Sequence, residues 1–218
     1  MIKINLLKSL PKSKRKIKNR LSKKTKKKIK ISRKYDFDYF DGSRDYGYGG
    51  YYYDGRWVSV AKDIIKFFKL KKNDKILDVG CAKGFLLYDL FNQGMDVYGL
   101  DVSKYAKNKS IIPIKKKINI GNAKKLPYPD NFFDAAISIN TIHNLDKNDC
   151  VNAIKELNRV VKDKKKIYIQ VDSYANKLQK KIFEEWVLTA KFHDFTYNWV
   201  KLFKEYNYKG SYNWTIIK

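Results

Sequence analysis

The residues Lys-Ile-Leu-Asp-Val-Gly-Cys-Ala-Lys-Gly at positions 75–84 decide the fold predicted for this chain. Ile76, Leu77 and Val79 are typical of a buried strand, and two glycines separated by three residues then turn the chain into a helix-periodic run from Phe85 to Phe91. Such a turn lets the backbone approach a ligand closely, and the helix start offers unpaired N–H groups to electron-rich atoms. The pattern predicts a nucleotide-like cofactor at this turn.

Apolar runs and helix-periodic runs alternate along the rest of the chain. Strands are predicted at residues 76–79, 97–101, 114–120, 133–139, 166–171 and 212–217, and a further β-rich piece at residues 186–189. This alternation is typical of an α/β fold in which helices cover both faces of a parallel sheet.

Charge is distributed unevenly along the 218 residues. The chain has 48 Lys and Arg against 22 Asp and Glu, a net charge of +26, and residues 1–34 hold 16 of the basic residues and no acidic one. Because this segment has few apolar side chains to offset the entropy of ordering, we expect a disordered or frayed-helix arm. Clustered lysines favour contact with nucleic acid or an anionic membrane, but a merely solubilising tail is an equally open interpretation.

Residues 35–56 are rich in both glycine and aromatic rings, which favours a lid or N-terminal extension in front of the main domain at residues 57–218. We expect Tyr46, Tyr48 and Trp57 to contact the substrate, although such rings can also simply cover the sheet edge. Arg56 is expected to pair with a carboxylate, either of the cofactor or of the protein.

Two cysteines give no disulfide framework, and the Cys and His spacing fits no metal site, so we expect a cytoplasmic protein without a metal. The apolar runs are too short to span a bilayer, which takes about 18 residues.

The glycine pattern distinguishes between two kinds of cofactor. A dinucleotide fingerprint requires glycines where this chain has Gly80, Ala82 and Phe85, so two of the three are absent. Asp78, Gly80, Cys81 and Gly84 instead resemble motif I of the class I S-adenosylmethionine-dependent methyltransferases. The resemblance implies a Rossmann-like, mostly parallel seven-stranded sheet with an antiparallel last strand. The implied cofactor is S-adenosyl-L-methionine, with S-adenosyl-L-homocysteine as product.

The resemblance covers roughly residues 57–172 and carries further cofactor-binding positions. Those matched to the family are Asp101 and Val102 after the second strand, Asn122 and Ala123 after the third, and Asn140 after the fourth. Asp101 resembles the ribose-binding acid of the family. Ala82 replaces a common glycine, which permits binding if its φ is negative, and Asn122 replaces an aspartate but keeps an acceptor oxygen.

A methyltransferase acting on a hydroxyl also requires a base. His143 follows the fourth strand and is the candidate, although packing or helix capping would equally account for it. Asp172 is a candidate for the acceptor pocket. We expect a methyltransferase for a small-molecule, glycan or lipid-precursor acceptor. An RNA methyltransferase that uses the basic arm, and a non-catalytic binding module, remain alternatives, and oligomeric state is open.

Overall fold

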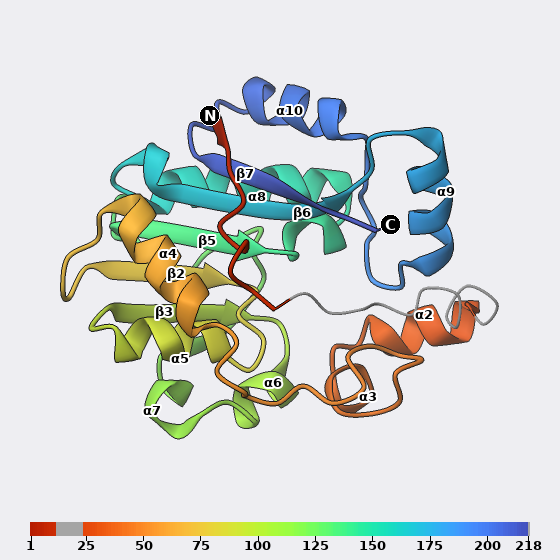
Figure 1. The fold of residues 1–218 in the computed structure, drawn as a ribbon, viewed down its shortest axis with the longest axis horizontal. Helices are drawn as coiled ribbons and strands as arrows, with labels where there is room; N and C mark the ends of the chain where they lie inside the picture. The colour runs from red at the N-terminus through yellow and green to blue at the C-terminus, as the bar shows by residue number, and fades with distance from the viewer. Residues whose placement is uncertain (12–23, 218) are drawn as a thin grey trace.

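The computed structural model describes residues 1–11 and 24–217, which form a seven-stranded sheet flanked by helices (Figure 1). The strands are β1 (Ile2–Lys3), β2 (Lys75–Val79), β3 (Asp96–Asp101), β4 (Ile118–Ile120), β5 (Ala135–Ile139), β6 (Ile167–Ser173) and β7 (Ser211–Ile216). Their order across the sheet is β1-β7-β6-β5-β2-β3-β4. The α/β class, the parallel sheet and the strand number are therefore confirmed.

The predicted antiparallel last strand is wrong. β7 pairs parallel with β6, from Tyr168 opposite Ser211 to Ser173 opposite Ile216. After β6 the chain leaves through α9 (Lys177–Trp186) and returns through α10 (Thr196–Glu205), so β7 starts at the same edge of the sheet as β6. A helical crossover of this kind joins parallel strands, whereas a short hairpin would have reversed the direction.

Two shorter predictions also need correction. The strand expected at residues 114–120 is divided into a short helix, α7 (Ile112–Lys115), and the strand β4. Pro113 lies in the first turn of α7, where its missing N–H leaves no hydrogen bond unmade. The piece predicted as β-rich at residues 186–189 is the end of α9 and the loop after it.

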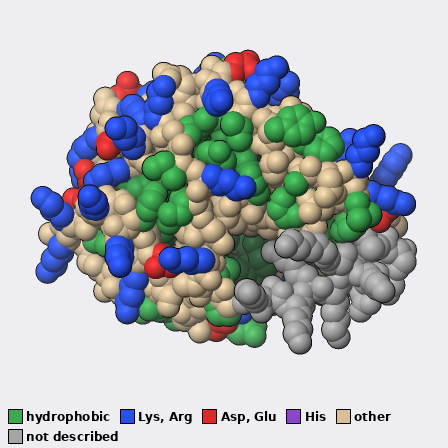
Figure 2. Space-filling model, turned by 45° about the horizontal axis from the view of Figure 1, so that its top comes forward, with side chains coloured by type: hydrophobic (Ala, Val, Ile, Leu, Met, Phe, Trp, Pro, Cys, Tyr) green, Lys and Arg blue, Asp and Glu red, His purple; other side chains and the backbone are tan. Residues whose placement is uncertain are grey.

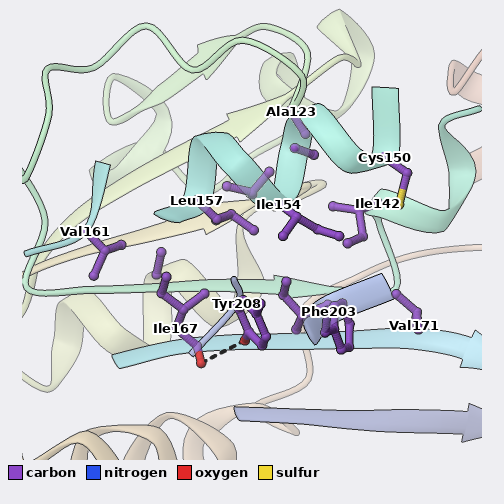
Figure 3. Packing of buried hydrophobic residues seen from close by; sticks show 14 of the residues in the cluster. Ala123, Ile142, Cys150, Ile154, Leu157, Val161, Ile167, Val171, Phe203 and Tyr208 are labelled. Atoms are coloured by element: carbon purple, nitrogen blue, oxygen red, sulfur yellow. Dashed lines mark hydrogen bonds between the residues drawn. The ribbon is translucent and has the colours of Figure 1, made fainter. Parts of the chain in front are cut away.

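Side chains of the central strands alternate between two apolar layers. Ile76 and Val97 face a cluster with α4 (Val58–Phe68), α5 (Phe85–Asn92) and α7. Leu77 and Val79 face a second cluster, formed with α8 (Lys147–Val160) and α10, part of which is shown in Figure 3. The remaining helices are α2 (Lys26–Ser32), α3 (Phe37–Phe40), α6 (Lys104–Asn108) and the 3-10 turns η1 (Ile142–Asn144) and η2 (Lys164–Lys166).

The N-terminal segment is partly built into the domain. Ile2 and Lys3 pair parallel with Ser211 and Tyr212, and Leu6 is only 4% exposed in the α4 cluster. The prediction of a disordered arm is thus corrected for these residues, because backbone pairing and apolar burial offset the cost of ordering. Residues 12–23, the middle of the predicted arm, lie outside the described residues.

Basic side chains are spread over the surface as well as concentrated near the N-terminus. Figure 2 shows lysine and arginine side chains across the visible face, with few acidic ones among them. No helix in the described ranges is long and apolar enough to cross a membrane.

Candidate cofactor and acceptor site

The turn after β2 has the left-handed backbone that its glycines favour. The φ angles of Gly80, Ala82 and Gly84 are +83°, +52° and +73°. A Cβ at Gly80 would lie 2.0 Å from Oγ1 of Thr141, so only glycine fits between this turn and the end of β5. Gly84 is the N-cap of α5, which directs the first N–H groups of that helix toward the same edge of the sheet.

Ala82 does not meet the condition of a negative φ under which its replacement of glycine would permit binding. An alanine in the left-handed region costs roughly 1–2 kcal/mol. Its N–H donates a hydrogen bond to Oδ2 of Asp101 at 2.7 Å, a charge-assisted contact that offsets this strain. The left-handed conformation of Ala82 is therefore part of the hydrogen-bonded connection between the turn after β2 and the end of β3.

Asp101 ends β3 and joins the turn after β2 to the chain after β3. One carboxylate oxygen accepts from Ala82, and the other accepts from the N–H of Ser103 at 2.8 Å. Burial raises the pKa of Asp101, which is only 9% exposed. Backbone N–H groups of Ser103, Ala82 and Val102 lower this pKa in turn, and a carboxylate with about four acceptor sites keeps capacity for a ligand hydroxyl.

Asp78 lies beneath the same turn. Its pKa is raised to about 7, first by burial and then by the neighbouring Asp101 carboxylate. Burial also raises the pKa of the Cys81 thiol, so Cys81 is a packing residue of the turn rather than a reactive thiol. A cationic ligand group beside Asp78 would favour its ionised form.

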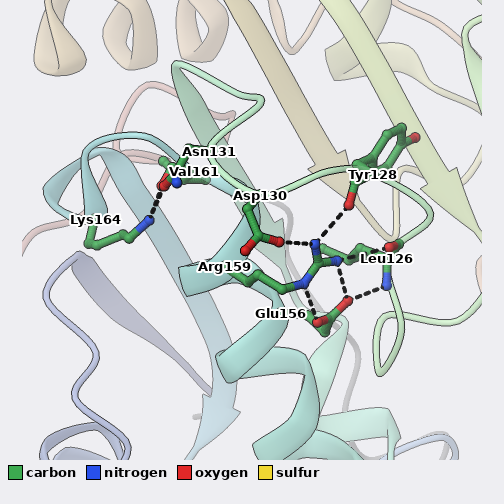
Figure 4. A network of polar contacts seen from close by, with 8 residues as sticks. All are labelled: Leu126, Tyr128, Asp130, Asn131, Glu156, Arg159, Val161 and Lys164. Carbon is green, nitrogen blue, oxygen red and sulfur yellow. Dashed lines mark hydrogen bonds and ion pairs between the residues drawn. The ribbon is translucent and has the colours of Figure 1, made fainter.

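The loop after β4 is held in place by Arg159 of α8 (Figure 4). The guanidinium donates to the carbonyl oxygens of Tyr128 at 2.8 Å and Leu126 at 3.1 Å, and it pairs with Glu156 and Asp130. This network fixes the backbone that follows the predicted adenine-binding positions.

The cofactor-binding positions predicted after β3 and after β4 differ in exposure. Val102 is 47% exposed beyond β3, and Ala123 is buried. Oδ1 of Asn122 accepts from the N–H of Lys124 at 3.1 Å, so the amide oxygen predicted to meet the adenine amino group already closes a local turn.

Asn140, at the end of β5, has a φ of +52° and belongs to a hydrogen-bonded chain across three strands. Its Oδ1 accepts from Thr215 at 2.9 Å, and Thr215 accepts from the side chain of Gln170 at 2.8 Å. The amide is thereby oriented at the carboxyl edge, where ligands bind in open α/β sheets.

His143 lies in η1 and is paired with Asp172 at the end of β6. The side chain is 2% exposed, Nε2 lies 3.3 Å from Oδ2 of Asp172, and Nδ1 accepts from the N–H of Asp172 at 3.4 Å. The structure thus brings together a histidine and a carboxylate that were predicted separately.

Residues 35–57, here called the strap, run beside the carboxyl ends of the strands, as α3 does in Figure 1. The main contact between strap and turn was not predicted. Nζ of Lys83 donates to both oxygens of Asp41, at 2.7 and 2.6 Å, and to the carbonyl oxygen of Tyr51 at 2.6 Å. The Tyr105 hydroxyl of α6 donates to Asp41 at 2.6 Å. Asp41 therefore joins the strap to the turn after β2 and to α6, the helix that follows β3.

Two further contacts fix the strap and the chain just before it. The Tyr53 hydroxyl donates to Oδ1 of the buried Asp89 in α5 at 2.6 Å. On the far side, Arg33, which follows α2, donates to the carbonyl oxygen of Ala190 at 3.0 Å. The chain therefore crosses from the α9 side of the sheet edge to the α5 side.

The residues predicted for the strap occupy varied positions. Arg56 pairs with Asp54 of the protein, its Nε donating at 2.8 Å. Tyr48 stacks on Tyr51 with ring centroids 4.5 Å apart, and Trp57 packs partly buried against the α4 cluster. Tyr46 is half-buried, and its N–H donates to the carbonyl oxygen of Ser43 at 2.9 Å. The sequence signal for the missed Asp41 contact was Lys83, a lysine between the two glycines of the turn. A lysine that becomes buried there requires a partner for its charge.

A parallel sheet with this strand order, a glycine turn after its central strand and an acid ending the next strand define a class I S-adenosylmethionine-dependent methyltransferase fold. Residues 77–169 match the family described as a methyltransferase domain. S-adenosyl-L-methionine is the cofactor of this family. Among the described residues, no group of His, Cys, Asp and Glu is arranged to hold a metal ion.

Several curated relatives share the matched region. An uncharacterized protein of Methanocaldococcus jannaschii is 34% identical over 112 residues, which is 51% of this chain and 42% of that protein. A demethylmenaquinone methyltransferase of a Geobacillus strain is 31% identical over 116 residues, 49% of each chain. A 24-methylenesterol C-methyltransferase of Arabidopsis thaliana is 31% identical over 141 residues, 61% of this chain and 34% of that protein. The chain thus spans about half or less of the length of these relatives.

Solved structures agree with the fold. The YcgJ protein of Bacillus subtilis has a TM-score of 0.56 at 19% identity, covering 67% of this chain and 66% of that chain. An S-adenosylmethionine-dependent methyltransferase of Methanosarcina mazei has a TM-score of 0.54 at 22% identity, covering 66% of this chain and 82% of that chain. At these identities the similarity concerns the fold.

Proposed function

We propose that this protein binds S-adenosyl-L-methionine at the carboxyl ends of β2 and β3 and transfers its methyl group to a small-molecule, glycan or lipid-precursor acceptor. The observation that carries the proposal is Asp101, whose carboxylate accepts from Ala82 of the glycine turn and from Ser103 after β3, which holds it at the carboxyl edge of the sheet. Two vicinal hydroxyls, as in a ribose, match a carboxylate in this position.

Other residues complete the cofactor site in this proposal. The backbone from Gly80 to Gly84 lies close to the methionine part, and Asp78 pairs with its amino group. Asn122 and Ala123 border the adenine. The bound cofactor supplies an electrophilic methyl group on a sulfonium, so the protein chiefly orients the acceptor and excludes water.

The strap supports an acceptor site beside β5 and β6. It carries Tyr35, Tyr39 and Tyr48, whose rings contact one another at centroid distances of 5.1 and 5.3 Å. Flat rings with a polar tip suit a small organic acceptor. Two relatives have names that specify a demethylmenaquinone and a sterol as acceptors, which supports a small-molecule acceptor here.

Calorimetry with S-adenosyl-L-methionine and S-adenosyl-L-homocysteine tests the proposal, using Asp101→Ala and the control Asp96→Asn. Asp96 is at the opposite end of β3 and pairs with Lys117 at 2.9 Å. Losing hydrogen bonds to a charged group costs about 1.5–3 kcal/mol each, so we expect Asp101→Ala to weaken binding at least tenfold. We expect the control to bind like wild type. No heat with wild type, or no effect of Asp101→Ala, would leave a non-catalytic module as the better interpretation.

Deleting residues 12–23 separates the small-molecule proposal from an RNA methyltransferase. Unchanged turnover on a small acceptor supports the proposal. Turnover on RNA that requires these residues and falls steeply with salt would replace it.

A further inference from the structure

The His143 and Asp172 pair determines which side chain can take a proton. Nδ1 of His143 accepts from the N–H of Asp172, so in the neutral ring the proton is on Nε2. Nε2 then donates toward Oδ2 of Asp172 at 3.3 Å. Both nitrogens are occupied by one neighbour, and the side chain is 2% exposed. His143 therefore has no free lone pair to offer an acceptor.

Asp172, unlike His143, has an atom that can accept a further hydrogen bond. Its side chain is 12% exposed at the carboxyl end of β6, and within the described chain its Oδ1 has no hydrogen-bond partner. Asp172 lies two residues beyond Gln170, whose carbonyl oxygen accepts from the N–H of Asn140 at 2.8 Å. The free oxygen is therefore at the same edge as the predicted methyl site.

The strap approaches this carboxylate with its tyrosines. Burial raises the pKa of the Tyr39 hydroxyl, and Tyr48, Tyr35 and the Asp172 carboxylate raise it further. The chain just before the strap is also tied to the region of the pair: Arg33 donates to the carbonyl oxygen of Ala190, and the N–H of the next residue, Lys191, donates to the carbonyl oxygen of His143 at 3.1 Å. The surroundings combine aromatic surfaces with one carboxylate oxygen able to accept a hydrogen bond.

We propose that Asp172 is the catalytic residue that accepts the proton of an acceptor hydroxyl, that His143 is the positioning residue that orients it, and that the acceptor is a neutral ring compound bearing that hydroxyl. The inference rests on the proposed function and specifies its acceptor class. It assigns the role of base to the carboxylate beside His143, the residue that the sequence offered as a candidate.

The methyl transfer conserves atoms and charge. The acceptor oxygen forms a bond to the methyl carbon while the carbon–sulfur bond of the cofactor breaks and its electron pair stays on sulfur. The hydroxyl proton passes to Oδ1 of Asp172, which becomes a neutral carboxylic acid and later loses the proton to water. His143 keeps its own proton on Nε2 throughout and holds Oδ2.

A spectroscopic probe tests this without knowledge of the natural acceptor. 4-Nitrophenol is titrated into protein saturated with S-adenosyl-L-homocysteine, and its absorbance separates the phenol from the phenolate. We expect wild type to bind the neutral phenol and to raise its pKa, because a carboxylate accepts the hydroxyl hydrogen and repels the phenolate. We expect Asp172→Asn to abolish the rise and His143→Gln to reduce it. The control Asp96→Asn should match wild type.

The variants are chosen to keep the fold. The amide introduced by Asp172→Asn retains an oxygen that can accept from the Nε2–H of His143, and Asp172→Ser provides a smaller second variant. With an acceptor identified by product analysis, Asp172→Asn should lower kcat about 100- to 10,000-fold at an unchanged KM for the cofactor.

Other results would overturn the inference. They are a wild type that binds the phenolate or no phenol, tighter binding of benzylamine than of the phenol, or full kcat in both Asp172 variants. Each of these results is compatible with cofactor binding that depends on Asp101. The inference can therefore fail while the proposed function holds.

Discussion

Lys83 and Asp41 form an ion pair at 2.6 Å between the glycine turn and the strap, with the lysine side chain only 7% exposed. Burial raises the pKa of the Asp41 carboxyl, but hydrogen bonds from Lys83 and Tyr105 outweigh it and leave the pKa below its ordinary value. The pair therefore connects the glycine turn after β2 to the strap, which lie beside the proposed cofactor and acceptor sites.

Breaking this pair should loosen the strap and weaken cofactor binding together. Lys83→Met leaves Asp41 without its cation, and we expect faster hydrogen exchange over residues 35–57 and at least a fivefold weaker affinity for S-adenosyl-L-methionine. The control Lys117→Met breaks an exposed pair with Asp96, which should matter little. Exchange and affinity equal to wild type in Lys83→Met would contradict the coupling.

Two glycines with positive φ allow strain and steric clash to be separated. Gly55→Ala places a Cβ in open space at a φ of +76°, so only backbone strain of about 1–2 kcal/mol is expected. Gly80→Ala adds a clash with Thr141, and we expect a total loss of about 2–5 kcal/mol in the free energy of unfolding. Urea unfolding measures both, and similar losses would show that Thr141 moves aside.

Asp78 should make the ligand-free protein less stable as the pH rises. Its pKa of about 7 lies above the ordinary value near 4, so between these values the native state holds a proton that the unfolded state has lost. Stability attributable to this group is therefore highest below about pH 4 and falls until about pH 7. Asp78→Asn should remove that fall and be more stable than wild type at about pH 8, as measured by urea unfolding at both ends of the range. A wild type and variant with parallel pH profiles would refute the prediction.

Arg159→Met should destabilise the loop after β4. It removes hydrogen bonds to two backbone carbonyls and to Glu156, so we expect a loss of about 1–3 kcal/mol and weaker cofactor binding. Arg159→Lys should recover only part, because an ammonium cannot reproduce the planar set of donors. Lys162→Met, which breaks an exposed pair with Asp134, serves as the control in thermal unfolding. Equal melting of all three variants would rule out the bracing role.

The sequence was sufficient to predict those parts of the fold and the site where residue type and spacing indicate the same structure. The buried strand before Gly80, the glycine turn and Asp101 at the next strand end all follow from local spacing, because parallel strands bring their carboxyl ends to one edge. The direction of β7 did not follow, since it depends on the path of α10. The pairing of His143 with Asp172 depends on the register of β6 beside β5, which the sequence leaves open.

The strap contacts were harder to predict for a different reason. Asp41 and Lys83 are separated by 42 positions, and neither lies in a periodic element that would indicate their contact. The positive φ of Ala82 was also unpredictable from residue type, since alanine disfavours it and only the hydrogen bond to Asp101 accounts for it.

The pairing of β1 with β7 has a consequence for biosynthesis. Ile2 is synthesised long before its partner Ser211, and every other strand of the sheet is made between them. Until β7 has left the ribosome, Ile2 and Lys3 have no strand to pair with, so the outer edge of the sheet cannot be completed. Closing so long a loop is slow, so the N-terminal strand should be among the last elements of the domain to reach its native place.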